Sequence, residues 1–269
     1  MRSGTNWLGA LLNLHPRINC RGEYHFERLA DAFERWAAYH ADSGVGARVV
    51  ETSREALRDT VRRCLKAGID AKPEADWQGD RTPHHVDRLV PGAPTVCILR
   101  DGRDVVVSRL FHTIRRGFVP GPDGVNARER FEADPGHYTE HPEQLLGCED
   151  ITRFMARGWA EHIARDAEAI LGACDDVFPV RYEAVRAQPE AERRRVYEFF
   201  GLNPDEAAAL SAEDKTEPGF DRGEDASSFY RAGVAGGWPK YFTDDAKQWF
   251  KDEAQPALEL CGYEANADW

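Results

Sequence analysis

The sequence predicts an α/β fold, with a P-loop-like parallel sheet flanked by helices on both faces, in a single domain over residues 1–269. Two observations carry this prediction. The opening loop RSGTNW holds a glycine and small hydroxyl residues and runs into an apolar helical pattern, an arrangement typical of phosphate binding at a helix N-terminus. Further along, apolar runs typical of strands alternate with amphipathic helical patterns. The chain of 269 residues is long enough for one large core.

The elements of the first half follow from their patterns. NWLGALLNLH, which ends at Pro16, is the first predicted helix. A second helix is predicted from an N-cap at Ser53 to Gly68. APTVCILR, over residues 93–100, is a continuous apolar run of the kind expected for a strand covered on both faces, and a helix is predicted directly after it over residues 101–117.

The second half contains two irregular stretches. Residues 117–147 are rich in Gly, Pro and His without a sustained period, which predicts an irregular lid or acceptor-binding loop. Residues 215–243, called the late loop below, are again Gly-rich and loop-like, and a last helix is predicted to begin near Thr243. Between the two stretches the patterns predict a helix over residues 148–174, a strand over 177–183 and a helix over 186–201.

The beginning of the chain lacks the strand that usually precedes a phosphate loop. Only Met1 precedes RSGTNW, so we predict a fold whose first strand is missing. Either the chain was started late or the protein has no central strand. We expect a truncated start and weak activity for the chain as printed, because a loop at a free terminus has to become ordered on binding.

Composition and charge restrict the partners. The net charge of −12 argues against a nucleic-acid backbone as a ligand. The six cysteines form no C-x-x-C pair, which indicates buried thiols in a reducing compartment, and we expect a cytoplasmic location. No apolar run approaches the roughly 20 residues of a membrane span, and no signal peptide is visible. We expect no bound metal, and the sequence does not decide whether the protein forms a homodimer.

Arg100 and Ser108 form the first candidate site. Arg100 stands where an apolar strand ends, and Ser108 lies eight residues later, about two turns into the following helix. Ligands of open parallel sheets bind at the carboxyl ends of the strands, where Arg100 suits a phosphate and Ser108 offers a second donor. The alternative is a surface arginine in a helix-capping turn beside a solvated serine.

The segment YRAGVAGGWPKYFT, over residues 230–243, is the second candidate. It combines Arg231, Gly233, a Gly-Gly pair and Trp238 without a helical or strand period. Glycines let backbone N–H groups approach an anion closely, and an arginine among them adds charge. The alternative is a flexible surface loop anchored by Trp238.

In the same order, RSGTNW, ILRDGRDVVVS and YRAGVAGGWPKYFT resemble the signature segments of sulfotransferases that use 3′-phosphoadenosine-5′-phosphosulfate (PAPS). The family pattern is a PKSGTTW or PRSGTTL loop, an Arg and a Ser eight residues apart, and a late RKGxxGDWKNxFT loop. The resemblance spans nearly the whole chain. It implies the sulfotransferase fold and transfer of a sulfonyl group from PAPS to a hydroxyl or amine, without a metal.

The resemblance also implies roles for individual residues. Ala232 stands where the family often has Lys, which removes one cation. Tyr182, in VRYEAV, resembles a family tyrosine that helps to hold the adenine, and its alternative is a core tyrosine at a strand end. The implied set is Arg2 as cation of the loop; Ser3, Gly4, Thr5 and Asn6 as the 5′-phosphosulfate cradle; Trp7 as the adenine platform; Arg100 and Ser108 for the 3′-phosphate; and Arg231, Ala232 and Gly233 in the late loop.

Two residues are candidates for the catalytic base. Glu23 lies in CRGEYHFE, which resembles the CGEE or KEPHFF segment of members that use a Glu base. His84 lies in RTPHH, which departs from the KTHLP motif of members that use a His base, because Pro83 intervenes. RTPHH looks more like the EKTPxYF segment of the members with a Glu base, which makes Arg81 a cationic helper and favours Glu23 as the base. His25 is a weaker candidate, and without the resemblance Glu23 would be a solvated loop carboxylate or a helix cap.

Two other functions remain as alternatives. A P-loop kinase is disfavoured because the chain has no GxxxxGK[ST] motif. A non-catalytic remnant of the sulfotransferase fold is the other. The acceptor stays open among small molecules, glycans, lipids and peptides, and Lys72 and Lys240 are either further cations of the anionic site or solvated lysines.

Overall fold

In the part of the chain that the structure describes, four short strands lie at the centre and are paired in parallel. The computed structural model describes residues 3–20, 22–41, 46–67, 72, 75–81, 92–119, 121–210, 225–227 and 233–269. Within these residues β1 (Ile18–Cys20) pairs with β2 (Trp77–Gly79), and β3 (Thr95–Leu99) pairs with β4 (Val177–Arg181). Helices and parallel strands alternate as the sequence predicts, but the described strands form two small sheets where one sheet was expected.

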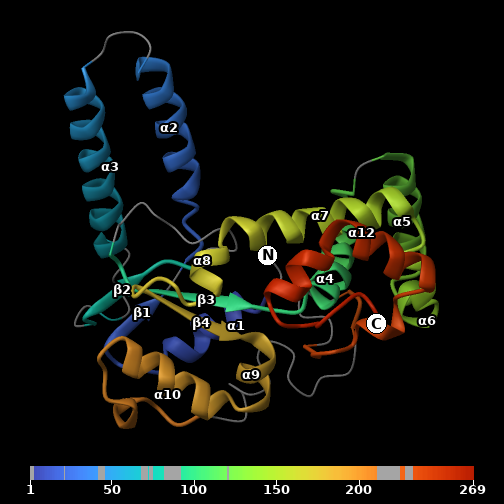
Figure 1. Cartoon of the computed structure of the whole chain (residues 1–269). Coiled ribbons are helices and arrows are strands. Elements are labelled where there is room, and N and C mark those ends of the chain that lie inside the picture. Colours follow the sequence, from blue (N-terminus) through green and yellow to red (C-terminus); the bar gives the residue numbers. More distant parts are fainter. Residues whose placement is uncertain are drawn as a thin grey trace.

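Helices lie on both sides of the strands (Figure 1). On one side are the helix that follows the opening loop and the two helices that follow β4. On the other side and beyond the strand ends lies a second group, of three long helices and the four-residue α8, in which each helix contacts at least one other. The first group is α1 (Thr5–Leu12), α9 (Tyr182–Ala187) and α10 (Pro189–Phe199), and the second is α4 (Gly102–Arg116), α7 (Glu149–Arg165), α8 (Ala167–Ile170) and α12 (Asp244–Leu260).

The core consists of two main clusters. One lies between α4, α7 and α12, where Trp159 and Phe250 are fully buried. A Cβ at Gly102 would lie 2.5 Å from the Trp159 ring, so α4 can begin this close to α7 only with a glycine. The other cluster joins α1 to β4 and α10, and there the Tyr197 hydroxyl donates to the Leu11 carbonyl at 2.6 Å. This second cluster anchors the helix that follows the opening loop.

The segment over residues 117–147 is helical and does not form the irregular loop that the sequence predicts. It contains α5 (Gly121–Ala133), α6 (His137–Glu140) and the 3-10 helix η1 (Pro142–Gln144). Phe131, Tyr138 and Leu146 are buried in the α4 cluster. Packing of these side chains outweighs the low helix propensity of the glycines and prolines, on which the prediction of a loop was based. A role of this segment beside the acceptor stays a prediction.

Several other boundaries differ from the prediction. A long hairpin of α2 (Glu27–Ala41) and α3 (Ala47–Ala67) projects from the body (Figure 1). Ser53 is an interior residue of α3 and not its N-cap, because serine inside a helix costs only about 0.5 kcal/mol. Phe154 and Leu171, two apolar residues of the segment predicted as a helix over 148–174, are exposed. The predicted helix at Thr243 is confirmed, since this residue caps α12, and the remaining 3-10 helices are η2 (Pro204–Glu206) and η3 (Trp238–Lys240).

The described chain begins at Ser3, and its first strand, β1, comes after α1. No strand therefore precedes the opening loop among the described residues. Among all the residues that the structure describes, no helix has both the length and the apolar character needed to cross a membrane.

Candidate functional site

Gly4 fixes the shape of the opening loop. It precedes α1 with φ +91°, a left-handed conformation that side chains rarely adopt. A Cβ there would also lie 2.6 Å from Cδ2 of Tyr182. Backbone conformation and space therefore both demand glycine. The loop leads into the N-terminus of α1, where backbone N–H groups lack partners within the helix.

Tyr182 lies where the opening loop meets the ends of β3 and β4. It is the first residue of α9, directly after β4, and is 6% exposed. The guanidinium of Arg100, which follows β3, lies 4.3 Å from the centre of its ring. The Trp7 ring meets it edge-on at 6.1 Å. Trp7 itself is only 3% exposed, so its predicted role as an adenine platform would require its ring to become accessible.

Asp104 connects this place to the late loop, and sequence reasoning missed it. Its carboxylate accepts hydrogen bonds from the Gly236 N–H at 2.7 Å and the Trp238 N–H at 3.0 Å. Its Oδ2 lies 3.8 Å from Nη2 of Arg100, which donates to the Val234 carbonyl at 2.8 Å. Burial raises the pKa of the Asp104 carboxyl, against the lowering effects of Arg100 and the two N–H groups. The only signal in the sequence was its position four residues after Arg100.

Ser108 stands one helical turn beyond Asp104 in α4. Residues four apart lie on the same face of a helix, so Ser108 and Asp104 share one face. Ser108 is partly exposed. The Arg100 end of β3 and this face of α4 therefore border the late loop together.

Glu23 and Arg81 lie next to each other at the carboxyl ends of β1 and β2. Oε1 of Glu23 is 3.6 Å from Nε of Arg81, and both side chains are partly exposed. The Tyr24 N–H donates to the Asp80 carboxylate at 3.2 Å, which fixes the backbone beside Glu23. A Cβ at Gly9 would lie 3.2 Å from Cδ of Arg81, so this arginine lies across α1. His25, the weaker candidate, has φ +55° in the same segment.

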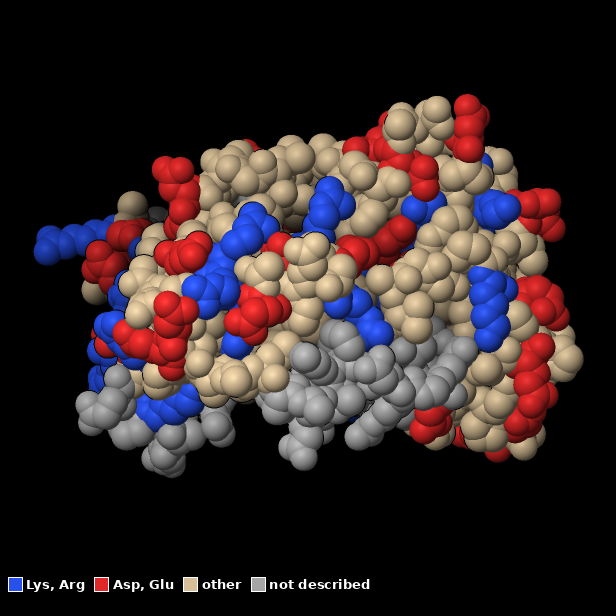
Figure 2. Space-filling model, turned by 90° about the horizontal axis from the view of Figure 1, so that it is seen from below, with Lys and Arg blue, Asp and Glu red and all other residues tan. Residues whose placement is uncertain are grey.

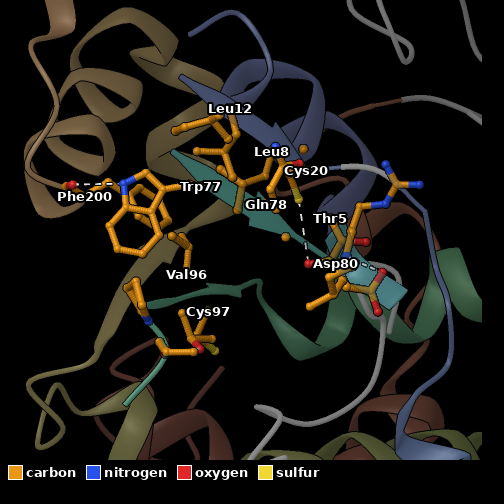
Figure 3. Close-up of a pocket in the computed structure, with 18 of the residues that line it drawn as sticks. Thr5, Leu8, Leu12, Cys20, Trp77, Gln78, Asp80, Val96, Cys97 and Phe200 are labelled. Atoms are coloured by element: carbon orange, nitrogen blue, oxygen red, sulfur yellow. Dashed lines mark hydrogen bonds between the residues drawn. The ribbon is translucent and has the colours of Figure 1, made fainter. Parts of the chain in front are cut away.

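A cavity of about 610 Å³ lies between β2 and β3 (Figure 3). Ser3, Thr5 and Arg81 are among its lining residues, so the opening loop and the arginine beside Glu23 share one space. Val96 and Cys97 of β3 line the cavity and are partly buried. Val96 packs against the core cluster that contains α1, and Cys97 packs against the cluster that contains α4, so β3 has apolar cover on both faces as the sequence predicts. Leu8, Leu12 and Trp77 also line it.

The remaining sequence candidates divide into two groups. Arg2, His84, Arg231 and Ala232 lie outside the described residues, whereas Gly233 is described and has φ +56°. Lys72 donates to the carbonyls of three residues at the end of α1 and the start of β1, so the structure places it at a helix end, away from a solvated position. Lys240 lies 5.5 Å from the centre of the Tyr241 ring.

The electrostatics of the site are local. Figure 2 shows Lys and Arg side chains interspersed with Asp and Glu on one face of the molecule. Charges further apart than about 8 Å are largely screened at physiological salt, so Arg100 and Arg81 matter more to an anion than the net charge. Among the described residues, no group of three or more His, Cys, Asp or Glu side chains is arranged to hold a metal ion.

The model of a protein family described as the sulfotransferase family matches residues 1–206. The chain belongs to the sulfotransferase family. The match includes the opening loop, the Glu23 and Arg81 pair, Arg100 and Tyr182, and ends before the late loop. No curated protein matches the chain. The predicted family is therefore confirmed for this sulfotransferase, and sulfonyl transfer is the general activity that the family supports.

Proposed function

We propose that the protein transfers a sulfonyl group from PAPS to a hydroxyl or amine of an acceptor. One observation carries the proposal. Segments far apart in the sequence, namely the opening loop, the ends of β3 and β4 and the late loop, meet around Arg100 and Tyr182. A nucleotide with two separate phosphate groups needs anion-binding groups of this kind from several directions.

In this proposal the opening loop, Ser3 to Asn6 with Arg2, holds the 5′-phosphosulfate at the N-terminus of α1. Arg100 and Ser108 hold the 3′-phosphate at the end of β3. Tyr182 and Trp7 contact the adenine. The late loop, with Arg231, Ala232 and Gly233, covers the nucleotide, and Asp104 supports that loop through its Gly236 and Trp238 N–H groups.

Glu23 is the proposed base. Its carboxylate takes the proton of the acceptor as the acceptor oxygen or nitrogen bonds to sulfur. At the same time the bond from sulfur to the 5′-phosphate oxygen breaks, and 3′,5′-ADP leaves with the electron pair of that bond. Arg81, which is ion-paired with Glu23, orients the carboxylate and offers positive charge near the transferred group. His84 is the other proposed base.

The experiment measures transfer of label from [³⁵S]PAPS to an acceptor panel of phenols, sugars, lipids and peptides, with 3′,5′-ADP binding measured by calorimetry. Arg100→Ala is expected to weaken 3′,5′-ADP binding by about 10–100-fold, because it removes hydrogen bonds to a charged group. Glu23→Gln is expected to abolish transfer and leave nucleotide binding unchanged. Glu259→Gln, at an exposed carboxylate bonded to Gln255, is the matched control and retains full transfer.

Specific results would contradict each assignment. Unchanged 3′,5′-ADP affinity in both Arg2→Ala and Arg100→Ala would exclude the proposed nucleotide site. Full transfer by Glu23→Gln would move the base to His84. Phosphoryl transfer from ATP that depends on magnesium would favour the kinase alternative.

A further inference from the structure

The α2–α3 hairpin projects from the body of the protein, and its two helices are in contact with each other (Figure 1). They meet along a line of apolar side chains, with Phe26 and Ala30 at the start of α2 and Leu57 and Val61 in the second half of α3. Ala37, two turns after Ala30 on the same face of α2, is also buried. This line divides the surface of the hairpin into two sides.

One side of the hairpin carries ion pairs. Nη2 of Arg54 in α3 lies 3.2 Å from Oε2 of Glu34 in α2, and its Nη1 lies 2.7 Å from Oε2 of Glu51. Arg58, which directly follows Leu57 of the contact line, has its Nη1 3.7 Å from Oε1 of Glu51. The charges on this side are therefore of both signs and are paired within and between the two helices.

The other side is apolar and exposed. In two antiparallel helices, the residues that directly precede those of the contact line lie on the same side, since successive residues are about 100° apart. Here Leu29 precedes Ala30, and Trp36 precedes Ala37. The exposed residues of this side, called the apolar face below, are Leu29, Ala32, Trp36 and Tyr39 of α2 and Val49, Ala56, Thr60 and Cys64 of α3.

Large side chains on the apolar face are more exposed than the interior of a hairpin requires. The exposed fraction is 48% for Leu29, 36% for Trp36, 72% for Tyr39 and 51% for Val49. Helices at a protein surface usually turn charged or polar side chains to water, and a continuous apolar patch marks an interaction surface. The apolar face therefore needs a partner.

The distribution of side-chain sizes fits a second copy of the chain. On α2 the apolar face has the large side chains of Leu29, Trp36 and Tyr39, whereas on α3 it has the small ones of Ala56 and Thr60. When two such faces meet about a two-fold axis, α2 of each copy can pack on α3 of the other, so that large residues lie opposite small ones. The face is complementary to itself in this arrangement.

The area of the apolar face is also sufficient for a dimer. Helices α2 and α3 have 15 and 21 residues, so at about 1.5 Å per residue they are roughly 22 and 31 Å long, and side by side they are about 20 Å wide. One face then covers roughly 500 Å², and a pair of faces buries about 1,000 Å². This value is at the lower limit of about 1,000 Å² for a specific interface.

A lipid surface fits the hairpin less well. Helices that lie on a membrane have Lys and Arg on the side opposite their apolar residues, where these side chains meet anionic headgroups. In this hairpin, Arg54 and Arg58 on the charged side are paired with Glu34 and Glu51. Their positive charge is therefore already balanced.

We propose that the apolar face of the α2–α3 hairpin binds the same face of a second copy, and that the four helices form an antiparallel bundle with α2 of each copy on α3 of the other. Because this interface contains none of the residues proposed to bind PAPS, it does not depend on the proposed function.

Sedimentation velocity of the full chain at about 1–100 μM tests the dimer, since an interface of this small area is expected to bind in the micromolar range. Tyr39→Glu is expected to weaken dimerisation by at least about tenfold. Phe118→Glu is the matched control, because the Phe118 side chain is 70% exposed and lies outside the hairpin, and it is expected to leave dimerisation unchanged. Where Tyr39→Glu lowers Tm, Val49→Lys at the other exposed end of the face decides.

A mixing experiment tests the pairing of α2 with α3. Tyr39 lies near the end of α2 and Val49 near the start of α3, so Tyr39 of one copy is expected to face Val49 of the other. Chains with Tyr39→Glu and chains with Val49→Lys are each expected to be monomeric, whereas an equal mixture forms mixed dimers. A mixture that stays monomeric would overturn this pairing.

Three further results would overturn the proposal. The first is a chain that remains monomeric at about 100 μM, and the second is an equal effect of Tyr39→Glu and Phe118→Glu. The third is co-sedimentation of the monomeric chain with vesicles of phosphatidylcholine and phosphatidylserine that Tyr39→Glu abolishes, which would assign the apolar face to a lipid surface.

Discussion

Replacing Asp104 with asparagine is expected to destabilise the protein and loosen the late loop together. The asparagine side chain has nearly the same shape as the aspartate side chain but only one acceptor atom. In the native structure the two carboxylate oxygens of Asp104 accept the Trp238 and Gly236 N–H groups, at 3.0 and 2.7 Å, and the side chain is 4% exposed. The substitution therefore tests whether this carboxylate holds the loop.

The magnitude follows from these contacts. Hydrogen bonds to a charged group contribute about 1.5–3 kcal/mol each, and asparagine can keep one of the two only as a weaker neutral bond. Its Nδ2 group would face the other backbone N–H, leaving a buried donor unpaired at a cost of about 1–3 kcal/mol. Removing the buried charge offsets part of this loss, because burial disfavours the carboxylate, as the raised pKa of Asp104 indicates. We expect a net loss of about 2–4 kcal/mol, or a fall in Tm of roughly 4–12 °C.

Thermal denaturation and amide hydrogen exchange measure the two effects. Asp252→Asn is the matched control, because that carboxylate bonds to Arg153 at 2.7 Å on the surface and its loss is expected to cost less than about 1 kcal/mol. In Asp104→Asn the Gly236 and Trp238 amides are expected to exchange faster than in the control. A fall in Tm no larger than that of Asp252→Asn, with unchanged exchange at both amides, would refute the assigned role.

Gly4→Ala is expected to lower Tm by more than Gly201→Ala, since both positions have positive φ but only Gly4 faces Tyr182, and nothing lies within 4 Å of a Cβ at Gly201. An equal fall in Tm in the two variants, measured by calorimetry, would show that the Tyr182 side chain moves aside without a loss of stability. Stability is also expected to fall as pH rises from about 9 towards 11. Burial raises the pKa of Cys20 to about 11 and of Cys97 to about 12, so the folded chain retains protons that thiols in the unfolded chain lose near pH 9. Urea midpoints at about pH 8 and pH 10.5 measure this loss, and Cys97→Ala should reduce it.

The elements with long periodic patterns could be predicted from the sequence. The helix over 101–117 was bounded by Asp101, which caps α4, and by Gly117, which ends it with φ +69°. Thr243 caps α12 in the same way as Asp101 caps α4. Capping residues act through neighbouring backbone groups, so their effect is local and legible in the sequence.

The short strands and the segment over 117–147 could not be predicted in this way. β1 and β2 are three residues each, and their pairing joins positions 59 apart, from Ile18 to Trp77. Between residues 117 and 147, glycine and proline indicated a loop, whereas burial of Phe131 and Tyr138 against α4 gives a helix. Both results depend on contacts with distant residues, which local propensity does not contain.

The candidate site shows the same division. The sequence motifs predict Glu23 as the base and Arg81 as its cationic helper. In the structure, parallel pairing of β1 with β2 brings the two side chains to 3.6 Å. Asp104 stayed hidden between Arg100 and Ser108, because its partners are backbone N–H groups 132 and 134 residues away. Every residue except proline has a backbone N–H group, so no sequence motif can indicate which of these groups Asp104 contacts.

Tyr182 makes the parts of the site dependent on one another. Its ring leaves no room for a side chain at Gly4 and carries the Arg100 guanidinium on its face. Arg100 in turn donates to Val234 in the late loop. A displacement of the Tyr182 ring therefore changes its contact with the opening loop directly, and it changes the late loop by moving Arg100. Because the contacts are shared, the effects of substitutions at these positions on the free energy of unfolding are not expected to add independently.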